Sequence, residues 1–198
     1  MNPRNQAGIT MVEILVIIGI IVILATVHTP GSLTPIGFAN ARMAQSMRNM
    51  KQLHMVAQQM AFDGETNGST NLGWPGDSGG SFANWTAQII KGGYLTTNDL
   101  CKLLSAPGLI VPPGKIPPMN ETAVRVYAVT KDSPGDAVFL TTANFTNTPM
   151  GGEALNSSAK PYGNKGFAVF RKGGDGTIML PKQVGQTNLI GSFVPLCR

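Results

Sequence analysis

Glu13 is the residue of this 198-residue chain whose surroundings most strongly indicate a chemical role. It directly precedes an apolar run without any charge, from Ile14 to Val27. An ionised carboxylate at the start of a membrane-embedded segment costs a few kcal/mol, so its presence there points to a function, such as pairing with a positive charge. We therefore expect Glu13 to serve an interaction inside an apolar environment.

The element that must position Glu13 is a hydrophobic helix. Residues 9–27 would extend about 28 Å as a helix, close to the hydrocarbon core of a bilayer, which is about 30 Å thick. Two simpler interpretations are a secretory signal peptide, with Arg4 as its positive region and a poor cleavage site near Ala25, and a plain membrane anchor. Neither of them explains the acid at Glu13.

The order Gly8, Ile9, Thr10 and Glu13, followed by an Ile/Leu/Val run, resembles the prepilin cleavage and methylation motif. Chains with this motif are type IV pilins and type II secretion pseudopilins. Pro30 stands where many members of that family have a helix-kinking proline. The resemblance covers roughly the first thirty residues closely and the rest only in outline.

This resemblance implies a processing and assembly pathway. A prepilin peptidase would cut between Gly8 and Ile9 and methylate the new amino terminus at Ile9. Glu13 would then pair with the positively charged amino terminus of a neighbouring subunit, because an unpaired carboxylate in a filament core of low dielectric would be costly. The implied partners are other pilin or pseudopilin subunits, the peptidase, an inner-membrane assembly platform and, before assembly, membrane lipid.

The chain divides into four predicted parts, with a break rich in proline and glycine between the tail and the rest. These parts are a leader at 1–8, a transmembrane and assembly helix at 9–29, the break at 30–37 and a globular head at 38–198. The predicted location is a single pass through the inner membrane with the head in the periplasm, followed by incorporation into a periplasmic pseudopilus or a cell-surface pilus.

The head is predicted to be α+β, with an amphipathic helix packed on a small antiparallel sheet. Apolar residues at three- and four-residue steps predict a helix over 38–62, and shorter helices are expected at 82–90 and 99–104. The period then changes to two. The predicted strands are 123–130, 137–142, 166–171, 177–180 and an edge strand at 192–196.

Cys101 and Cys197 are the two cysteines of the chain. A bridge between them would stabilise the fold by about 4 kcal/mol in the chain-entropy model, and an oxidising compartment would permit it. The resemblance supports a bridge, since several pilins link their carboxy-terminal region in this way. The alternative is two independent thiols, because only a structure shows whether the two residues are close enough.

Other residues that could do chemistry lack the necessary companions. Asp175 has no second local carboxylate for calcium. The segment 77–80 has a serine at Ser78, but neither His28 nor His54 is a convincing base for it. His54 is expected to lie on a helix face rather than to bind a metal. We therefore predict a protein that is not an enzyme and has no metal site or cofactor.

Composition limits the remaining classes of function. The net charge is +5, but the basic residues are scattered, whereas a surface for nucleic acid usually shows a clustered patch. No nucleic-acid partner is expected. The function predicted from the resemblance is a structural subunit of a type II secretion pseudopilus or a type IV pilus. The alternatives are a membrane-anchored periplasmic binding module that does not polymerise, and a tethered hydrolase.

Overall fold

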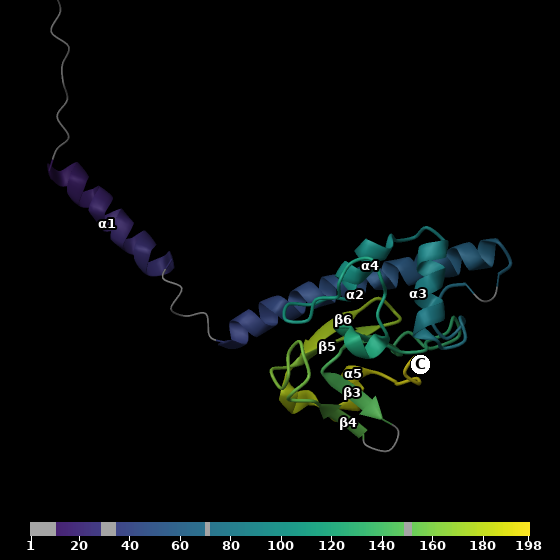
Figure 1. The fold of residues 1–198 in the computed structure, drawn as a ribbon. Coiled ribbons are helices and arrows are strands. Elements are labelled where there is room, and N and C mark those ends of the chain that lie inside the picture. The colour runs from purple at the N-terminus through teal and green to yellow at the C-terminus, as the bar shows by residue number, and fades with distance from the viewer. Residues whose placement is uncertain (1–10, 29–34, 70–71, 149–151) are drawn as a thin grey trace, which may run out of the picture. The chain divides into compact units, whose positions relative to one another are not determined.

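The computed structural model describes residues 11–28, 35–69, 72–148 and 152–198 (Figure 1). The chain forms two compact units, Met1–Pro35 and Ile36–Arg198, which we call the tail and the head. Each unit is described here by itself. The fold class of the head is α+β, with helices and a small antiparallel sheet, as the sequence predicts.

The tail contains one helix, α1 (Met11–His28). Its sequence is apolar except at Glu13, Thr26 and His28, and the apolar residues do not form a stripe on one face. The predicted segment 9–29 extends past α1 at both ends, and residues 9, 10 and 29 lie outside the described residues. Within the described parts of the chain, no helix combines the length and the apolar character needed to cross a bilayer.

The head begins with a long helix, α2 (Pro35–Thr66). The helix is longer than the predicted 38–62, so the last three residues of the predicted break, 35–37, belong to it. Proline is compatible with the first turn of a helix, where its missing N–H would have no partner in any case. One stripe of α2 is buried, as the periodicity predicts: Met43, Ser46, Met50, Leu53, His54, Ala57 and Met60.

The sheet against which α2 packs has four antiparallel strands in the order β1-β2-β5-β6. Their bounds are Val124–Val126, Val138–Thr142, Phe167–Arg171 and Gly176–Met179. β1 is shorter than predicted because the backbone turns after Val126, where the N–H of Val129 donates to the carbonyl oxygen of Tyr127. The predicted turn between β5 and β6 is confirmed.

Both faces of this sheet are covered. α2, α3 (Phe82–Lys91) and α4 (Thr97–Leu103) contribute to the larger core cluster, on the side of Phe139 and Phe170. The smaller cluster, around Phe145 and Phe167, lies on the other side, because residues 167 and 169 of β5 belong to it while residues 168 and 170 belong to the larger cluster. Figure 1 shows α2 on one side of the sheet and β3 and β4 on the other. Burial on two sides explains why every residue of β2 is buried.

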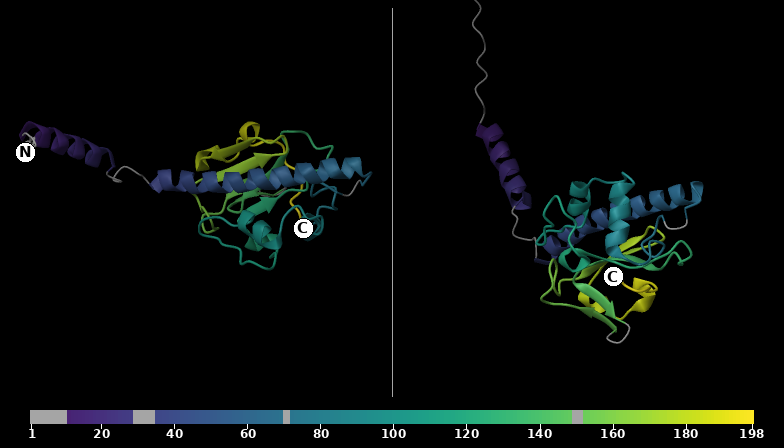
Figure 2. Two further views of the ribbon diagram at one scale, coloured as in Figure 1. Left: turned by 90° about the horizontal axis from the view of Figure 1, so that it is seen from above. Right: turned by 45° about the vertical axis from the view of Figure 1, so that its right-hand side comes forward.

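A second hairpin completes the smaller cluster and was absent from the sequence prediction. It pairs β3 (Phe145–Thr148) with β4 (Gly152–Leu155). Phe145 stacks on Phe167 with ring centroids 4.2 Å apart. Both views in Figure 2 show α2 extended along the sheet.

The predicted fifth strand at 192–196 is wrong. Ser192 makes a single parallel bridge to Ala137, and Leu196 makes a single antiparallel bridge to Tyr127. The segment therefore crosses the sheet instead of pairing along one strand, and Pro195 has no N–H for a ladder. Three short helical turns connect the remaining elements: η2 (Met119–Glu121), η3 (Pro181–Gln183) and α5 (Thr187–Ile190).

Candidate functional site

The residues that the sequence assigns to processing and assembly lie at the tail. Gly8, Ile9 and Pro30 fall outside the described residues, so their predicted roles in cleavage, methylation and kinking remain predictions. Glu13 lies in the first turn of α1, where only its backbone is described. The predicted role of Glu13 in assembly therefore stays a prediction.

The apolar side chains of α1 are largely exposed within the tail. Exposure ranges from 49% at Ile14 to 82% at Met11. The set comprises Met11, Val12, Ile14, Leu15, Val16, Ile17, Ile18, Ile20 and Ile21. Monomeric soluble proteins rarely expose a contiguous apolar surface of this kind.

Cys101 and Cys197 are free thiols in the structure, and the bridge between them stays a prediction. Both are buried in the larger core cluster. The Cys101 thiol, on α4, donates to the carbonyl oxygen of Lys115 over 3.6 Å. Burial raises the pKa of the Cys197 thiol to about 12, because an apolar environment disfavours the thiolate.

Backbone hydrogen bonds hold the carboxy-terminal segment against the rest of the head. Its last residues are bound to β1 and to the loop before α3: the N–H of Cys197 donates to Val126, and the N–H of Arg198 donates to Gly80. The carbonyl oxygen of Arg198 in turn accepts from the N–H of Phe82. These hydrogen bonds fix the last residues of the segment to β1 and to the loop before α3.

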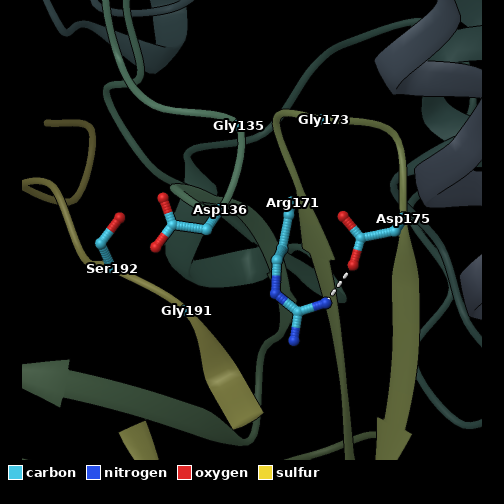
Figure 3. Close-up of a pocket in the computed structure, with 7 residues that line it drawn as sticks. All are labelled: Gly135, Asp136, Arg171, Gly173, Asp175, Gly191 and Ser192. Atoms are coloured by element: carbon cyan, nitrogen blue, oxygen red, sulfur yellow. Dashed lines mark hydrogen bonds and ion pairs between the residues drawn. The ribbon is translucent and has the colours of Figure 1, made fainter. Parts of the chain in front are cut away.

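Arg171, the last residue of β5, holds the other end of this segment (Figure 3). Its Nε donates to the carbonyl oxygen of Ile190 over 2.9 Å. The two terminal nitrogens donate to the carbonyl oxygen of Leu189 and to the carboxylate of Asp175. The guanidinium thus joins the carboxy-terminal segment to the turn between β5 and β6.

A polar hollow of about 690 Å³ surrounds this guanidinium. Its walls are Gly135, Asp136, Arg171, Gly173, Asp175, Gly191 and Ser192, and Figure 3 shows Asp136 and Asp175 on opposite sides of Arg171. Each nitrogen of the Arg171 guanidinium donates to a protein oxygen, so this cation is engaged in holding the fold together. The carboxylate of Asp175 accepts one of these hydrogen bonds.

His54 is a buried structural residue that joins α2 to the same turn. Its imidazole lies among Trp74, Phe139 and Phe170, at centroid distances of 5.5, 6.1 and 5.2 Å. Its Nε2 donates to the carbonyl oxygen of Lys172 over 2.7 Å. Burial lowers the pKa of His54, although the bond to Lys172 and the nearby Asp175 carboxylate oppose this effect.

The loop that contains Ser78 is also held by structural contacts. The Ser78 hydroxyl lies 2.7 Å from the side-chain oxygen of Gln88, to which it donates. The neighbouring Asp77 carboxylate accepts from the N–H of Lys131 over 3.1 Å. Across the described residues, no group of three or more His, Cys, Asp or Glu side chains is arranged to hold a metal ion.

Comparison of the chain with protein-family models, curated proteins and solved structures gives no match.

Proposed function

We propose that this chain is a structural subunit of a type IV pilin-like filament, either a type II secretion pseudopilus or a type IV pilus. In this proposal it is made as a prepilin, cleaved after Gly8, methylated at Ile9 and polymerised through its tail. The observation that carries the proposal is α1, a helix with apolar side chains on all sides that forms a unit separate from the head.

The energetics of α1 favour burial on every side. Burying a large apolar side chain contributes about 1.5–3 kcal/mol. Nine such side chains of α1 are exposed, by between 49% at Ile14 and 82% at Met11. A helix with a single apolar stripe would bury that stripe by docking on one partner. A helix that is apolar all round needs lipid or a bundle of like helices, and a filament core supplies the second environment.

Apolar contacts between tail helices do not fix their relative position, and in this proposal Glu13 does. An ion pair with the new amino terminus at Ile9 of a neighbouring subunit would fix the axial offset between two tails. Removal of one partner of a buried ion pair is strongly destabilising, by about 3–5 kcal/mol, because the other charge is left without compensation. Subunits that are out of register would therefore be disfavoured.

The proposed location follows from the same tail. Before assembly the tail lies in the inner membrane with the head in the periplasm, and the assembly platform then transfers it into the filament. The head supplies the outer surface of the filament and has no part in the chemistry of processing, because Gly8 and Ile9 are substrate residues of the peptidase.

The test is expression of the full chain together with a prepilin peptidase and an assembly platform. The mature protein should begin at a methylated Ile9, and Glu13→Ala should reach the membrane fraction without forming filaments. Glu13→Asp, which keeps the carboxylate, is the matched control and should assemble better than Glu13→Ala. An intact leader at residues 1–8, or normal filaments from Glu13→Ala, would contradict the proposal.

The same experiment separates the filament from a membrane-anchored binding module. Cross-linking between tails that depends on Glu13 is expected only if the chain polymerises. A chain that is cleaved and anchored but shows no contact between tails would favour the binding module.

A further inference from the structure

Asn67 and Gly68 form the only Asn-Gly pair of this chain, since every other asparagine precedes a residue that has a side chain. The side-chain amide of asparagine is one of the thermally labile groups of proteins. Its carbonyl carbon can be attacked by the backbone nitrogen of the next residue. Glycine favours this attack, because it has no Cβ to shield the nitrogen or to restrict rotation of the backbone.

The pair lies directly after the last residue of α2, Thr66. The backbone N–H of Ser69 donates to the carbonyl oxygen of Gly64 over 2.8 Å, and the N–H of Gly68 donates to that of Glu65 over 3.4 Å. Gly68 has φ +66°, in the left-handed region. These features are those of a Schellman motif, in which a left-handed glycine lets two backbone N–H groups bind the last turn of a helix.

The atoms that would react are accessible. Both Asn67 and Gly68 are exposed, and a Cβ placed on Gly68 would meet no atom within 4 Å. The hydrogen bond from Gly68 to Glu65 is long, at 3.4 Å, compared with about 2.9–3.0 Å for a usual backbone hydrogen bond. The nitrogen of Gly68 is therefore held weakly, and rotation of the backbone at Asn67 can bring it to the side-chain carbonyl carbon.

We propose that Asn67 is a site of spontaneous deamidation. The nitrogen of Gly68 bonds to Cγ of Asn67, and the bond from Cγ to Nδ2 breaks. The amide group leaves as ammonia and takes the proton that the Gly68 nitrogen loses. The product is a cyclic imide. Water then adds to one of the two imide carbonyl carbons and opens the ring, which returns a proton to the Gly68 nitrogen. Residue 67 becomes aspartate or isoaspartate, without oxidation or reduction.

The new carboxylate would weaken the end of α2. It lies at the carboxyl end of the helix, where the macrodipole is already negative. It also follows Asp63 by four residues, a spacing at which like charges on a helix repel each other. The carboxylate of Asp63 accepts from the Tyr94 hydroxyl over 2.7 Å, so this end of α2 is attached to the segment that follows α3.

The isoaspartate form would disturb the turn further, because the main chain then passes through the side-chain carbon and gains one atom. There is little room for the added length. A Cβ on Gly64 would lie 2.8 Å from the carbonyl oxygen of Leu72 and 2.9 Å from that of Ser69, so the loop folds closely over the helix end. We expect the hydrogen bond from Ser69 to Gly64 to be lost in this form.

The experiment is incubation of the full chain in a mildly alkaline buffer, followed by peptide mapping with mass spectrometry over time. Residue 67 should gain the mass that accompanies replacement of an amide by a carboxyl group, and part of the product should be a substrate for an isoaspartyl methyltransferase. Asn164 is the internal control, because it is also exposed in a turn but precedes Lys165. Equal rates at Asn67 and Asn164, or an unchanged Asn67, would overturn the proposal.

Variants test the role of each residue. Gly68→Ala keeps Asn67 and has open space for the added methyl group, so deamidation should become several-fold slower in a chain that still folds. Asn67→Gln should lose the modified product at this position. Asn67→Asp reproduces the aspartate form, and amide exchange at Ser69 should be faster in it than in the unaltered chain, with exchange in β5 unchanged. An undiminished rate in Gly68→Ala would contradict attack by the Gly68 nitrogen, and unchanged exchange in Asn67→Asp would contradict the effect on α2.

Discussion

The Nε2 atom of His54, on α2, lies 2.7 Å from the carbonyl oxygen of Lys172, directly after β5. A carbonyl oxygen can only accept, so Nε2 carries the hydrogen. The bond joins the first long helix of the head to a turn that lies 118 residues later in the chain. The ammonium of Lys172 continues this connection, because it donates to the carbonyl oxygens of Lys131 and Ser133.

The stability of the head should fall as the pH drops through the range where free histidine titrates. Burial lowers the pKa of His54 in the folded chain below the ordinary 6.5. Above pH 6.5 the imidazole is neutral in both states and imposes no penalty. Below this pH the unfolded chain takes up the proton first, so the free energy of unfolding decreases until the folded pKa is passed.

The measurement is urea unfolding of the full chain between pH 7.5 and about 5. His54→Gln keeps a side-chain N–H for Lys172 and should remove this part of the pH dependence. His28→Gln changes the other histidine of the chain and should leave this pH dependence unchanged. A profile that is the same in His54→Gln and in the unaltered chain would show that another group titrates.

Arg171→Ala should destabilise the head by about 2–3 kcal/mol, since it removes charge-assisted hydrogen bonds to Ile190 and Leu189 and leaves their carbonyl oxygens without these donors. Amide exchange in residues 187–192 should accelerate more than exchange in β2. Lys102→Ala is the control, because it removes an exposed ion pair with Asp99 and should change the unfolding midpoint little. Equal effects from the two substitutions would contradict the role of Arg171.

Gly73→Ala should destabilise the head by more than about 2 kcal/mol. Gly73 has φ +134°, and a Cβ there would lie 2.8 Å from the Cα of Ala61 on α2. The carbonyl oxygen of Gly73 also accepts from the buried indole N–H of Trp85 over 3.0 Å. Both features require the loop to stay close to the helix.

Gly79→Ala separates close approach from backbone strain. Gly79 also has a positive φ, +82°, but a Cβ there would meet no atom within 4 Å. Its cost should be limited to the strain of a left-handed residue, about 1 kcal/mol. Thermal unfolding of both variants tests the comparison, and an equal loss of stability would mean that contact with Ala61 contributes nothing.

The thiols of Cys101 and Cys197 should resist alkylation in the folded chain at pH 8, because both are buried and burial raises the pKa of Cys197 to about 12. Unfolding without a reductant should expose two reactive thiols per chain. Mass analysis after alkylation counts them. A chain that gains thiols only after reduction would instead contain the bridge that the structure does not have.

The sequence alone determined the local elements of this protein. A strong period of 3.6 marked α2, and alternation bounded by turn residues marked β2, β5 and β6, because these signals depend on neighbours within a few positions. The ends were less well determined: Pro35 was assigned to a break, although proline suits the first turn of a helix. The β3–β4 hairpin was not predicted, since its polar, glycine-containing strands carry little alternation.

Only the tertiary structure decided which distant residues meet. Nothing in the sequence indicates that His54 reaches Lys172, that Tyr162 reaches Arg42, or that Arg171 holds the segment ending at Ile190. Nor does it show that the two cysteines stay separate as thiols. Such contacts depend on the path of the whole backbone and on the order of strands in the sheet, whereas propensity and periodicity report only local conformation and burial.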